Sequence, residues 1–432
     1  MRRAAPARVL VALALVACDG IGRPIVGPVS EPDGGSPRCE ASPLCEPLPT
    51  FPPEHFAVPH APPPIGGDCD GDEVDDARDN CPGVPNADQD PAACARAAAD
   101  CARLVAGESA MPQTDLRGCA PAAPVTLGGS ASLRGADLSC ARLTLHAPAS
   151  ATVDLREIVA ASARVSLTVG AASTVELGRS TWAGSALAVR GPARLAADDV
   201  VFDRATLMLE PGEASDAGPG LEIRRSDLGA TTIWEAPSLR PGRVRVEASR
   251  LNGTHVDVRT LALYGTTIVA SRLAAEQLDA QEVDIRDAAI RTDRGAFAGV
   301  TLWEVAFERC VELRVTHSEL HGVSVPACPP DRFRVFESEL DGCNLAGGVE
   351  LDHSHFIAGV LGGGPETTLT SRQSVLDGVR FCALGSARFH GGELRCTRCE
   401  VRDFDEGRRV CLAETSIFER GCPPIELAPT CG

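Results

Sequence analysis

The chain has 432 residues, 44% of them hydrophobic and only 4% aromatic, and its formal net charge at pH 7 is −18. This length and apolar content allow one large folded domain together with an additional N-terminal tract. The negative charge argues against nucleic acid and against an anionic membrane surface as binding partners, because both would repel it.

Residues 1–18 have the organisation of a bacterial export signal. Arg2 and Arg3 form a basic start, and the apolar run from Val9 to Val16 is too short to span a bilayer. The run leads into the tetrapeptide Leu-Val-Ala-Cys, which ends at Cys18 and resembles the lipobox of bacterial lipoproteins. The resemblance implies that Cys18 is the lipidation site and the first mature residue.

Lipidation would anchor the chain in a membrane, since several acyl chains hold firmly where one does not. We therefore expect a lipid-anchored protein of the cell envelope, at the outer membrane or cell surface. Asp19, which follows directly, leaves the membrane and leaflet open. An ordinary secretory signal with an incidental cysteine is the alternative.

Residues 19–65 are rich in Pro, Gly and Ser. Such a composition predicts a disordered, extended tether with partly polyproline-like backbone. Cys39 and Cys45 are close enough in sequence to close a small loop within it.

An acidic segment follows, in which Asp68, Asp70 and Asp72 alternate around Gly71. Calcium takes six to eight oxygen ligands, and alternating carboxylates on a loop turned by glycine can converge on one ion. The segment continues with Asp75, Asp76, Asp79, Asn80, Cys81, Pro82, Asn86, Gln89 and Asp90, and as a whole it resembles one thrombospondin type 3 repeat.

That resemblance implies calcium as the cofactor. It implies as ligands the side chains of Asp68, Asp70, Asp72, Asp76 and Asp79, with a backbone carbonyl near Val74. Members of the family usually carry several repeats in tandem, whereas this chain has one. A solvated acidic loop is the alternative; an EF-hand fits less well, because the twelfth loop position carries Asp79 and not Glu.

A helix is predicted from Asp90, as N-cap, through Pro91 to about Val105, just before Gly107. Together with the acidic segment it forms a region spanning 66–106. We expect this helix, or the segment after it, to cover the open first coil of the domain that follows, because an exposed strand edge invites aggregation.

Residues 131–418 repeat one pattern: apolar, any, apolar, any, any, small, any, apolar. Fifteen copies begin at residues 131, 153, 175, 195, 221, 244, 261, 283, 300, 313, 333, 349, 369, 387 and 411, which makes fourteen intervals over 280 residues, a mean of 20. A period near 20 is typical of solenoids, in which each repeat buries its apolar face only by stacking on its neighbours.

The pattern favours β-coils over helical repeats. Positions one and three lie on the same side of a strand, and turn residues rather than a helical period separate the copies. A small residue at position six lets the backbone turn inward; these residues are Ser226, Ser249, Thr266, Ala288, Ser318, Ser338, Ser354, Ser374, Gly392 and Ser416. Position eight closes the coil with Leu228, Leu251, Ile268, Ile290, Phe307, Leu320, Leu340, Phe356, Leu376, Leu394 and Phe418.

These features resemble the right-handed, single-stranded parallel β-helix of pectate-lyase-like proteins. The resemblance implies an all-β solenoid of about 15 coils over residues 107–432, roughly 70 Å long at the usual strand spacing. A β-sandwich of many short strands is one alternative, and a leucine-rich or pentapeptide solenoid is another. Residues 135–143 contain two five-residue phrases of the pentapeptide kind, but the phrase does not continue.

The 18 cysteines of an exported chain suggest disulfides. Seventeen remain once Cys18 carries lipid, so at least one thiol is free or bonded to another chain. Cys310 and Cys343 occupy the same place in their copies. Zinc binding or thiol redox chemistry at Cys396 and Cys399 is a weaker alternative, because no second matching pair with His follows.

Charged side chains predicted to face outward on residues 313–393 are the best candidates for catalysis on a glycan, because paired carboxylates can act as acid and base. They are Arg314, His317, Glu319, Arg334, Glu337, Glu339, Glu350, Asp352, His353, His355, His390 and Glu393. Trp303 and Phe336, both at position four, are the outward aromatic residues. Outward positions of any solenoid are charged simply because they face water, so no catalytic residue is assigned.

The favoured function is therefore a non-catalytic, lipid-anchored envelope protein whose β-helix has a structural, adhesive or ligand-presenting role. Its expected partners are the membrane, through the lipid, and an envelope glycan or protein. The alternatives are a carbohydrate-active β-helix enzyme, either a polysaccharide lyase or a glycoside hydrolase, and a calcium-dependent adhesion module with the β-helix as spacer.

Overall fold

The computed structural model describes residues 68–70, 72–75, 78–81, 83–212, 219–237, 242–396, 410–413 and 416–419. The chain divides into two compact units, Met1–Glu46 and Pro47–Gly432, and every described residue belongs to the second. The export signal, Cys18, the tether with its two cysteines, and Cys399 therefore lie outside the described residues.

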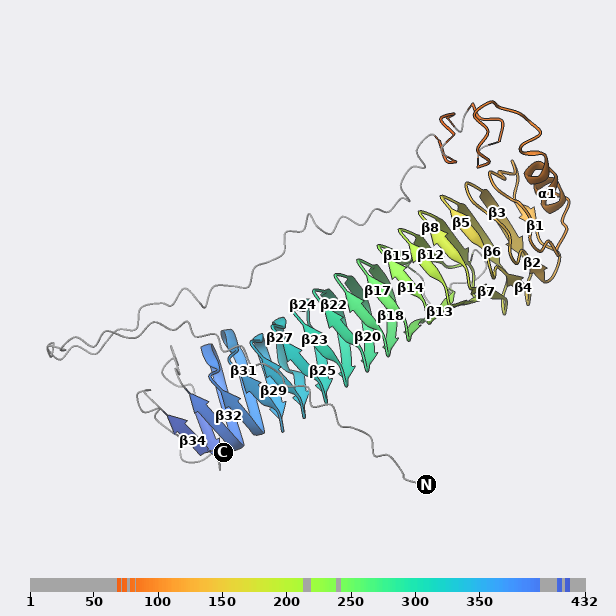
Figure 1. The fold of residues 1–432 in the computed structure, drawn as a ribbon. Helices are drawn as coiled ribbons and strands as arrows, with labels where there is room; N and C mark the ends of the chain where they lie inside the picture. Colours follow the sequence, from red (N-terminus) through yellow and green to blue (C-terminus); the bar gives the residue numbers. More distant parts are fainter. Residues whose placement is uncertain are drawn as a thin grey trace, which may run out of the picture. The chain divides into compact units, whose positions relative to one another are not determined.

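The second unit is an all-β, right-handed parallel solenoid, as the repeat predicts (Figure 1). All pairings between its strands are parallel, and they form three sheets that enclose one core. The solenoid has about 12 turns, slightly fewer than the fifteen expected.

Positions one and three of the repeat lie in the first sheet. Its separate strands are β2 (Ala131–Ser132), β4 (Thr152–Asp154), β7 (Thr174–Gly178), β10 (Arg194–Asp198), β13 (Gly220–Arg224), β16 (Val244–Glu247), β25 (Glu312–Thr316) and β33 (Val410–Ala413). The second sheet contains β5 (Val159–Ala161), β8 (Thr181–Ala183), β11 (Val201–Asp203), β14 (Asp227–Gly229), β17 (Arg250–Asn252), β19 (Thr267–Val269), β21 (Asp284–Arg286), β23 (Thr301–Trp303), β26 (Glu319–His321), β28 (Glu339–Asp341), β30 (His355–Ile357) and β34 (Ser416–Glu419).

The third sheet contains β1 (Val125–Thr126), β3 (Arg142–Ala147), β6 (Arg164–Val169), β9 (Ala186–Arg190), β12 (Thr206–Glu210), β15 (Thr232–Glu235) and β24 (Ala306–Arg309). Seven long strands turn corners and belong to more than one sheet: β18 (His255–Tyr264), β20 (Arg272–Gln281), β22 (Ala289–Ala298), β27 (Ser324–Phe336), β29 (Asn344–Asp352), β31 (Val360–Asp377) and β32 (Arg380–Cys396).

The second sheet places one inward side chain per strand, and these side chains stack into a continuous apolar ladder. From β8 to β31 its members are Trp182, Phe202, Leu228, Leu251, Ile268, Ile285, Leu302, Leu320, Leu340, Phe356 and Leu376, each at most 1% exposed. Complete burial of such side chains contributes about 1.5–3 kcal/mol each. The ladder is therefore a principal source of stability.

Two copies of the repeat were assigned the wrong register. The structure pairs Leu261 with Leu278 and Leu278 with Gly295, so these copies begin at 278 and 295 rather than at 283 and 300. Ile290 and Phe307, expected at position eight, instead face the core from the third sheet. The apolar–small–apolar spacing recurs at the next corner of these 17-residue coils, so the pattern also fits one sheet later.

The last copy is also shifted by one residue. The structure pairs Ala387 with Val410, so this copy begins at 410 rather than 411. Leu394 pairs with Ile417, which takes the place expected for Phe418.

Corners between the first and second sheets explain the small residue at position six. The residue before it has positive φ, as in His317 (51°), Glu337 (45°) and His353 (47°), and the following serine is buried. The hydroxyl of Ser338 accepts a hydrogen bond from the N–H of Ser318 (3.1 Å) and donates one to the carbonyl of Phe336 (2.7 Å). Serine therefore satisfies backbone groups that the corner removes from the sheet ladder.

The expected helix is present as α1 (Ala95–Val105), and it starts later than predicted. Its N-cap is Cys94, because the carboxylate of Asp90 accepts the N–H of Ala92 in a preceding turn (2.9 Å). Leu104 is fully buried in the main core beside the first coil, where Figure 1 shows α1 next to β1. None of the described helices is long and apolar enough to cross a membrane.

Candidate functional site

The described part of the acidic loop (residues 68–90) brings three of the predicted ligands together. One carboxylate oxygen from each of Asp68, Asp70 and Asp72 lies within 4.8 Å of the other two. Backbone amides hold these carboxylates in place: Glu73 N–H donates to Asp68 (2.8 Å) and Gly83 N–H to Asp70 (2.9 Å). The three side chains thus lie together, and their binding of a metal ion stays a prediction.

Asp72 is only 7% exposed, and its carboxylate links two parts of the loop. It accepts the N–H groups of Val74 (2.8 Å) and Asn86 (2.9 Å). Burial, together with repulsion from Asp72 and Asp79, raises the pKa of the Asp70 carboxyl, although amide donors from Gly83 and Asp72 oppose the change. Crowded carboxylates of this kind favour binding a cation, which removes the repulsion.

Asp79, a fourth predicted ligand, accepts hydrogen bonds from later residues of the acidic loop. Its Oδ1 accepts hydrogen bonds from the N–H of Cys81 (2.9 Å) and from Gln89 Nε2 (3.0 Å). Its Oδ2 is buried and, among the described residues, accepts no hydrogen bond. A buried carboxylate oxygen without a donor fits a bound cation, and an all-oxygen donor set suits calcium. Asp76 lies outside the described residues.

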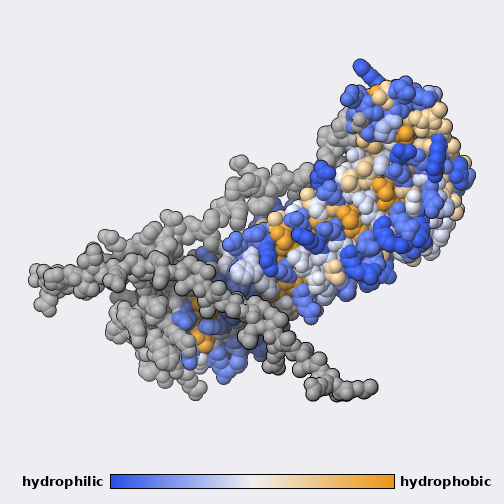
Figure 2. Space-filling view, in the orientation of Figure 1, coloured by the Kyte–Doolittle hydropathy of each residue, from blue (hydrophilic) through white to orange (hydrophobic). Residues whose placement is uncertain are grey.

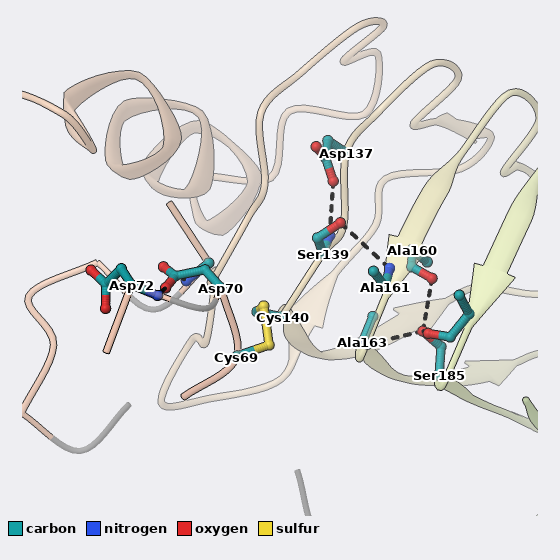
Figure 3. The surroundings of a disulfide bond; sticks show 12 residues. Cys69, Asp70, Asp72, Asp137, Ser139, Cys140, Ala160, Ala161, Ala163 and Ser185 are labelled. Carbon is teal, nitrogen blue, oxygen red and sulfur yellow. Dashed lines mark hydrogen bonds between the residues drawn. A yellow bond between two sulfur atoms is a disulfide. The ribbon is translucent and has the colours of Figure 1, made fainter. Parts of the chain in front are cut away.

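The acidic loop is covalently joined to the solenoid. Cys69, between two of the clustered aspartates, forms a disulfide with Cys140, and Figure 3 shows Asp70 and Asp72 close to this bond. A second disulfide, Cys101–Cys119, fixes α1 to the segment after it. The sequence indicated disulfides but not these pairings.

Six of the twelve charged candidates on residues 313–393 take part in ion pairs within the described part of the chain. His317 Nε2 lies 2.6 Å from Glu337, His353 Nδ1 lies 2.7 Å from Asp352, and both Arg334 (3.2 Å) and Arg372 (3.0 Å) contact Glu350. These pairs run along and between adjacent rungs, as expected for a solvated solenoid face. Figure 2 shows hydrophilic residues over most of the visible face, interrupted by hydrophobic ones.

Trp303 and Phe336 do not form an outward pair on one sheet, contrary to expectation. Trp303 belongs to the second sheet, is 44% exposed, and stacks on His321 with ring centroids 4.0 Å apart. Phe336 belongs to the first sheet, where Arg314 lies over its ring (5.4 Å). The wrong register of the copy assigned to residue 300 caused this error.

A cleft that the sequence did not indicate lies beside β15, with a volume of about 350 Å³. Glu235, at the end of that strand, accepts the N–H of Arg259 (2.8 Å), and burial raises the pKa of its carboxyl. Ion pairs between Arg259 and Glu276 (3.0 Å) and between Arg309 and Asp293 (3.1 Å) line the same cleft. No local motif marks Glu235, because its burial depends on the neighbouring coils.

No protein-family model matches the chain, and no curated protein matches its sequence. Among solved structures it is similar to tailspike protein 3 of bacteriophage CBA120, with 10% identity over 76% of this chain and 59% of that one, at a TM-score of 0.31. It is also similar to the periplasmic alginate epimerase AlgG, with 10% identity over 63% of this chain and 78% of that one (TM-score 0.22). The pentapeptide repeat protein HetL of the cyanobacterium Nostoc shows 15% identity over 56% of this chain and 84% of that one (TM-score 0.20).

The chain thus spans about three fifths of the length of the tailspike protein. Likenesses at these scores support no functional argument. The strand pairings of the chain itself define its class, a parallel β-solenoid with an acidic loop disulfide-bonded to its first coils.

Proposed function

We propose that this chain is a non-catalytic, lipid-anchored protein of the cell envelope, in which the acidic loop binds calcium and the β-solenoid has a structural, adhesive or ligand-presenting role. The observation that carries the proposal is the convergence of Asp68, Asp70 and Asp72 on a loop that is covalently tied to the solenoid. Calcium bound there would order the loop against the first coils. Disulfides among the described cysteines support export to an oxidising compartment.

Calcium titration of the mature, full-length chain tests the metal site. Asp72→Asn should weaken calcium binding at least about tenfold, because it removes a charged ligand and a support of the loop. Asp88→Asn is the matched control, since Asp88 is exposed in the same loop and, among the described residues, accepts a hydrogen bond only from the N–H of Asp90 (3.3 Å). Equal affinities for the two variants, or no binding by the parent chain, would refute the metal site.

The anchor rests on residues 1–18 and is tested separately. Cells expressing the chain should incorporate labelled fatty acid into it and retain it in the membrane fraction, whereas Cys18→Ser should release it. A mature protein whose Cys18 is removed or carries no lipid would refute the anchoring half of the proposal and leave the calcium site untouched.

A carbohydrate-active enzyme is the second candidate, and the cleft beside β15 is what favours it. A carboxyl group with a raised pKa next to an arginine is suited to acid–base chemistry on a glycan. Activity should be measured on neutral and uronic-acid polysaccharides with the parent chain and with Glu235→Gln, Glu337→Gln and His353→Ala. If the parent chain turns over a polysaccharide and any of these variants does not, the non-catalytic proposal is wrong and the chain is an enzyme.

A further inference from the structure

The acidic loop and α1 are in contact through two cysteines that are not disulfide-bonded in the structure. Cys81 is buried, and Cys94 is half-buried and packs against the cluster that contains Cys81. Sγ of Cys81 donates to the carbonyl of Val84 (4.0 Å), and Sγ of Cys94 donates to the carbonyl of Pro91 (3.5 Å). Both belong to a small apolar cluster with Val84 and Ala97, separate from the main core. Two thiols held together in an apolar cluster are positioned to form a bond with little movement.

Residues 81–94 enclose the groups that support two of the predicted calcium ligands, Asp72 and Asp79. The N–H of Asn86 donates to Asp72 (2.9 Å), and the side chain of Gln89 donates to Asp79 (3.0 Å). Gln89 also receives the N–H of Asn80 at its Oε1 (2.8 Å). A bond between Cys81 and Cys94 would therefore close a loop around both supports.

Oxidised cysteines lie on both sides of this pair. Cys69–Cys140 fixes the start of the acidic loop, and Cys101–Cys119 fixes α1. A compartment that oxidises these two pairs also oxidises a third pair in contact between them. We propose that Cys81 and Cys94 form a further disulfide in the mature protein, and that this bond preorganises the acidic loop for calcium; the second part rests on the proposed calcium site.

Formation of the bond follows ordinary thiol–disulfide exchange with a disulfide-bearing oxidant, such as an exported oxidoreductase or oxidised glutathione. Cys94 is the more accessible residue, so its thiolate attacks the oxidant, breaks the S–S bond there and releases one thiolate. The thiolate of Cys81 then attacks Sγ of Cys94 and releases the second. The two cysteine sulfurs lose two electrons in total, and their two protons leave with the reduced oxidant as two thiols.

Cys343 provides an internal control. It is a buried free cysteine at a corner between the second and third sheets, with its Sγ donating to the carbonyl of Leu320 (3.3 Å). This is the kind of contact that Thr254 makes at the same corner, where its hydroxyl donates to the carbonyl of Leu228 (2.8 Å). Cys343 has no second described thiol beside it and should remain reduced.

The first experiment is peptide mapping of the purified, full-length protein under non-reducing conditions, after alkylation of free thiols in denaturant. We expect a linked peptide containing Cys81 and Cys94, and an alkylated peptide containing Cys343. Alkylation of Cys81 and Cys94 in protein recovered from the oxidising compartment would overturn the proposal, whatever the calcium affinity.

The second experiment compares calcium titrations of the parent chain and the double variant Cys81→Ser/Cys94→Ser, which keeps the remaining disulfides. Loss of the enclosing bond should weaken calcium binding about tenfold, as removal of outer supports of a metal site does. Cys343→Ser should leave the affinity unchanged. An unchanged affinity in the double variant overturns the preorganising role, whereas absence of binding in the parent chain refutes the calcium site while leaving the disulfide established by mapping.

Discussion

Single residues with positive φ decide where the solenoid turns, and most of those at the corner after the first sheet are not glycine. Glu337 (45°) and His353 (47°) occupy such positions in successive turns. A left-handed conformation costs an ordinary residue about 1–2 kcal/mol. The chain tolerates this cost because hydrogen bonds from the rungs above and below fix each corner, as when Glu337 N–H donates to the carbonyl of Asp352 (2.9 Å).

Gly83 is one of the positions at which glycine itself is needed. Its φ is +113°, and a Cβ there would lie 2.7 Å from the backbone nitrogen of Gly118 and 3.0 Å from Cys140 Cβ. Gly83→Ala should therefore lower the free energy of unfolding by about 2 kcal/mol or more, since the strain and the contact with backbone add. Gly128→Ala is the control, because a Cβ at Gly128 meets nothing within 4 Å. Denaturant unfolding of both variants decides; equal stability would show that the acidic loop is not docked as described.

Asp154 and Arg156 predict a pH dependence of stability. The carboxylate of Asp154 accepts hydrogen bonds from Nε and Nη2 of Arg156 (2.8 Å each), and these bonds hold the pKa of Asp154 below its ordinary value. The folded pKa is below the unfolded one, so the stabilising effect is complete above the ordinary carboxyl range and is lost as the pH falls through the folded pKa. Because Arg156 is 41% exposed, the effect is only about 1 kcal/mol.

Asp154→Asn should therefore lower stability by about 1 kcal/mol at pH 7, with the difference from the parent chain vanishing as the pH falls below about 4. Thermal unfolding across this pH range measures it. Asp227→Asn is the control, because Asp227 is exposed on the second sheet and forms no ion pair within the described part of the chain. A difference that stays constant with pH would mean that the ion pair does not stabilise the fold.

At the scale of the elements, the corner serines connect one strand to the next. Ser338, Ser354 and Ser374 each accept the N–H of the serine one turn earlier, at 3.1, 3.4 and 3.1 Å. Each also donates to the carbonyl two residues before it in the chain. The row of hydroxyls continues the hydrogen-bond ladder through the corner, where the strands themselves are interrupted.

Ser338→Ala should destabilise the protein by about 1–2 kcal/mol, because it leaves the buried N–H of Ser318 without an acceptor. Ser371→Ala is a close control: Ser371 is 1% exposed in β31, and among the described residues its hydroxyl has no hydrogen-bond partner. Removing that hydroxyl should leave stability unchanged or raise it slightly. Equal losses in the two variants, measured by denaturant unfolding, would show that volume rather than hydrogen bonding matters at the corner.

The sequence predicts those features of the strands and corners that depend only on residues close together in the chain. The alternation of apolar residues and the serine at each corner depend on a few neighbouring positions, so the parallel solenoid and most rungs could be predicted. The register at Leu278 and Gly295 could not, because apolar residues at successive corners have the same spacing and only strand pairing tells them apart.

The same limit applies to the candidate site. Asp68, Asp70 and Asp72 lie within five residues of one another and could be grouped from spacing alone. The support of Asp72 by Asn86 and the bond from Cys69 to Cys140 depend on how the chain folds back, and no local pattern encodes them. The burial of Glu235 has the same origin.

At the scale of the whole solenoid, stability is close to a sum of contacts between neighbouring turns, because each turn touches only the next. Disulfides act differently, since they restrict the unfolded chain over the full length of the loop they close. Two of them differ in this respect: Cys69–Cys140 joins residues 71 apart, whereas Cys310–Cys328 joins residues 18 apart. Comparing the loss of one bridge with the loss of the other therefore measures how much stability depends on the length of the closed loop.

Replacing both cysteines of a bridge with alanine should cost about 1 kcal/mol more for Cys69–Cys140 than for Cys310–Cys328, because the entropy of closing a loop grows with the logarithm of its length. The comparison uses the free energy of unfolding of the two double variants in calcium-free buffer, so that metal binding does not add to the longer bridge. A larger loss for the Cys310–Cys328 variant would mean that local packing around the bridge outweighs chain entropy. Adding calcium should then stabilise the parent chain more than the Cys69→Ala/Cys140→Ala variant, since only the parent holds the acidic loop in place before the ion binds.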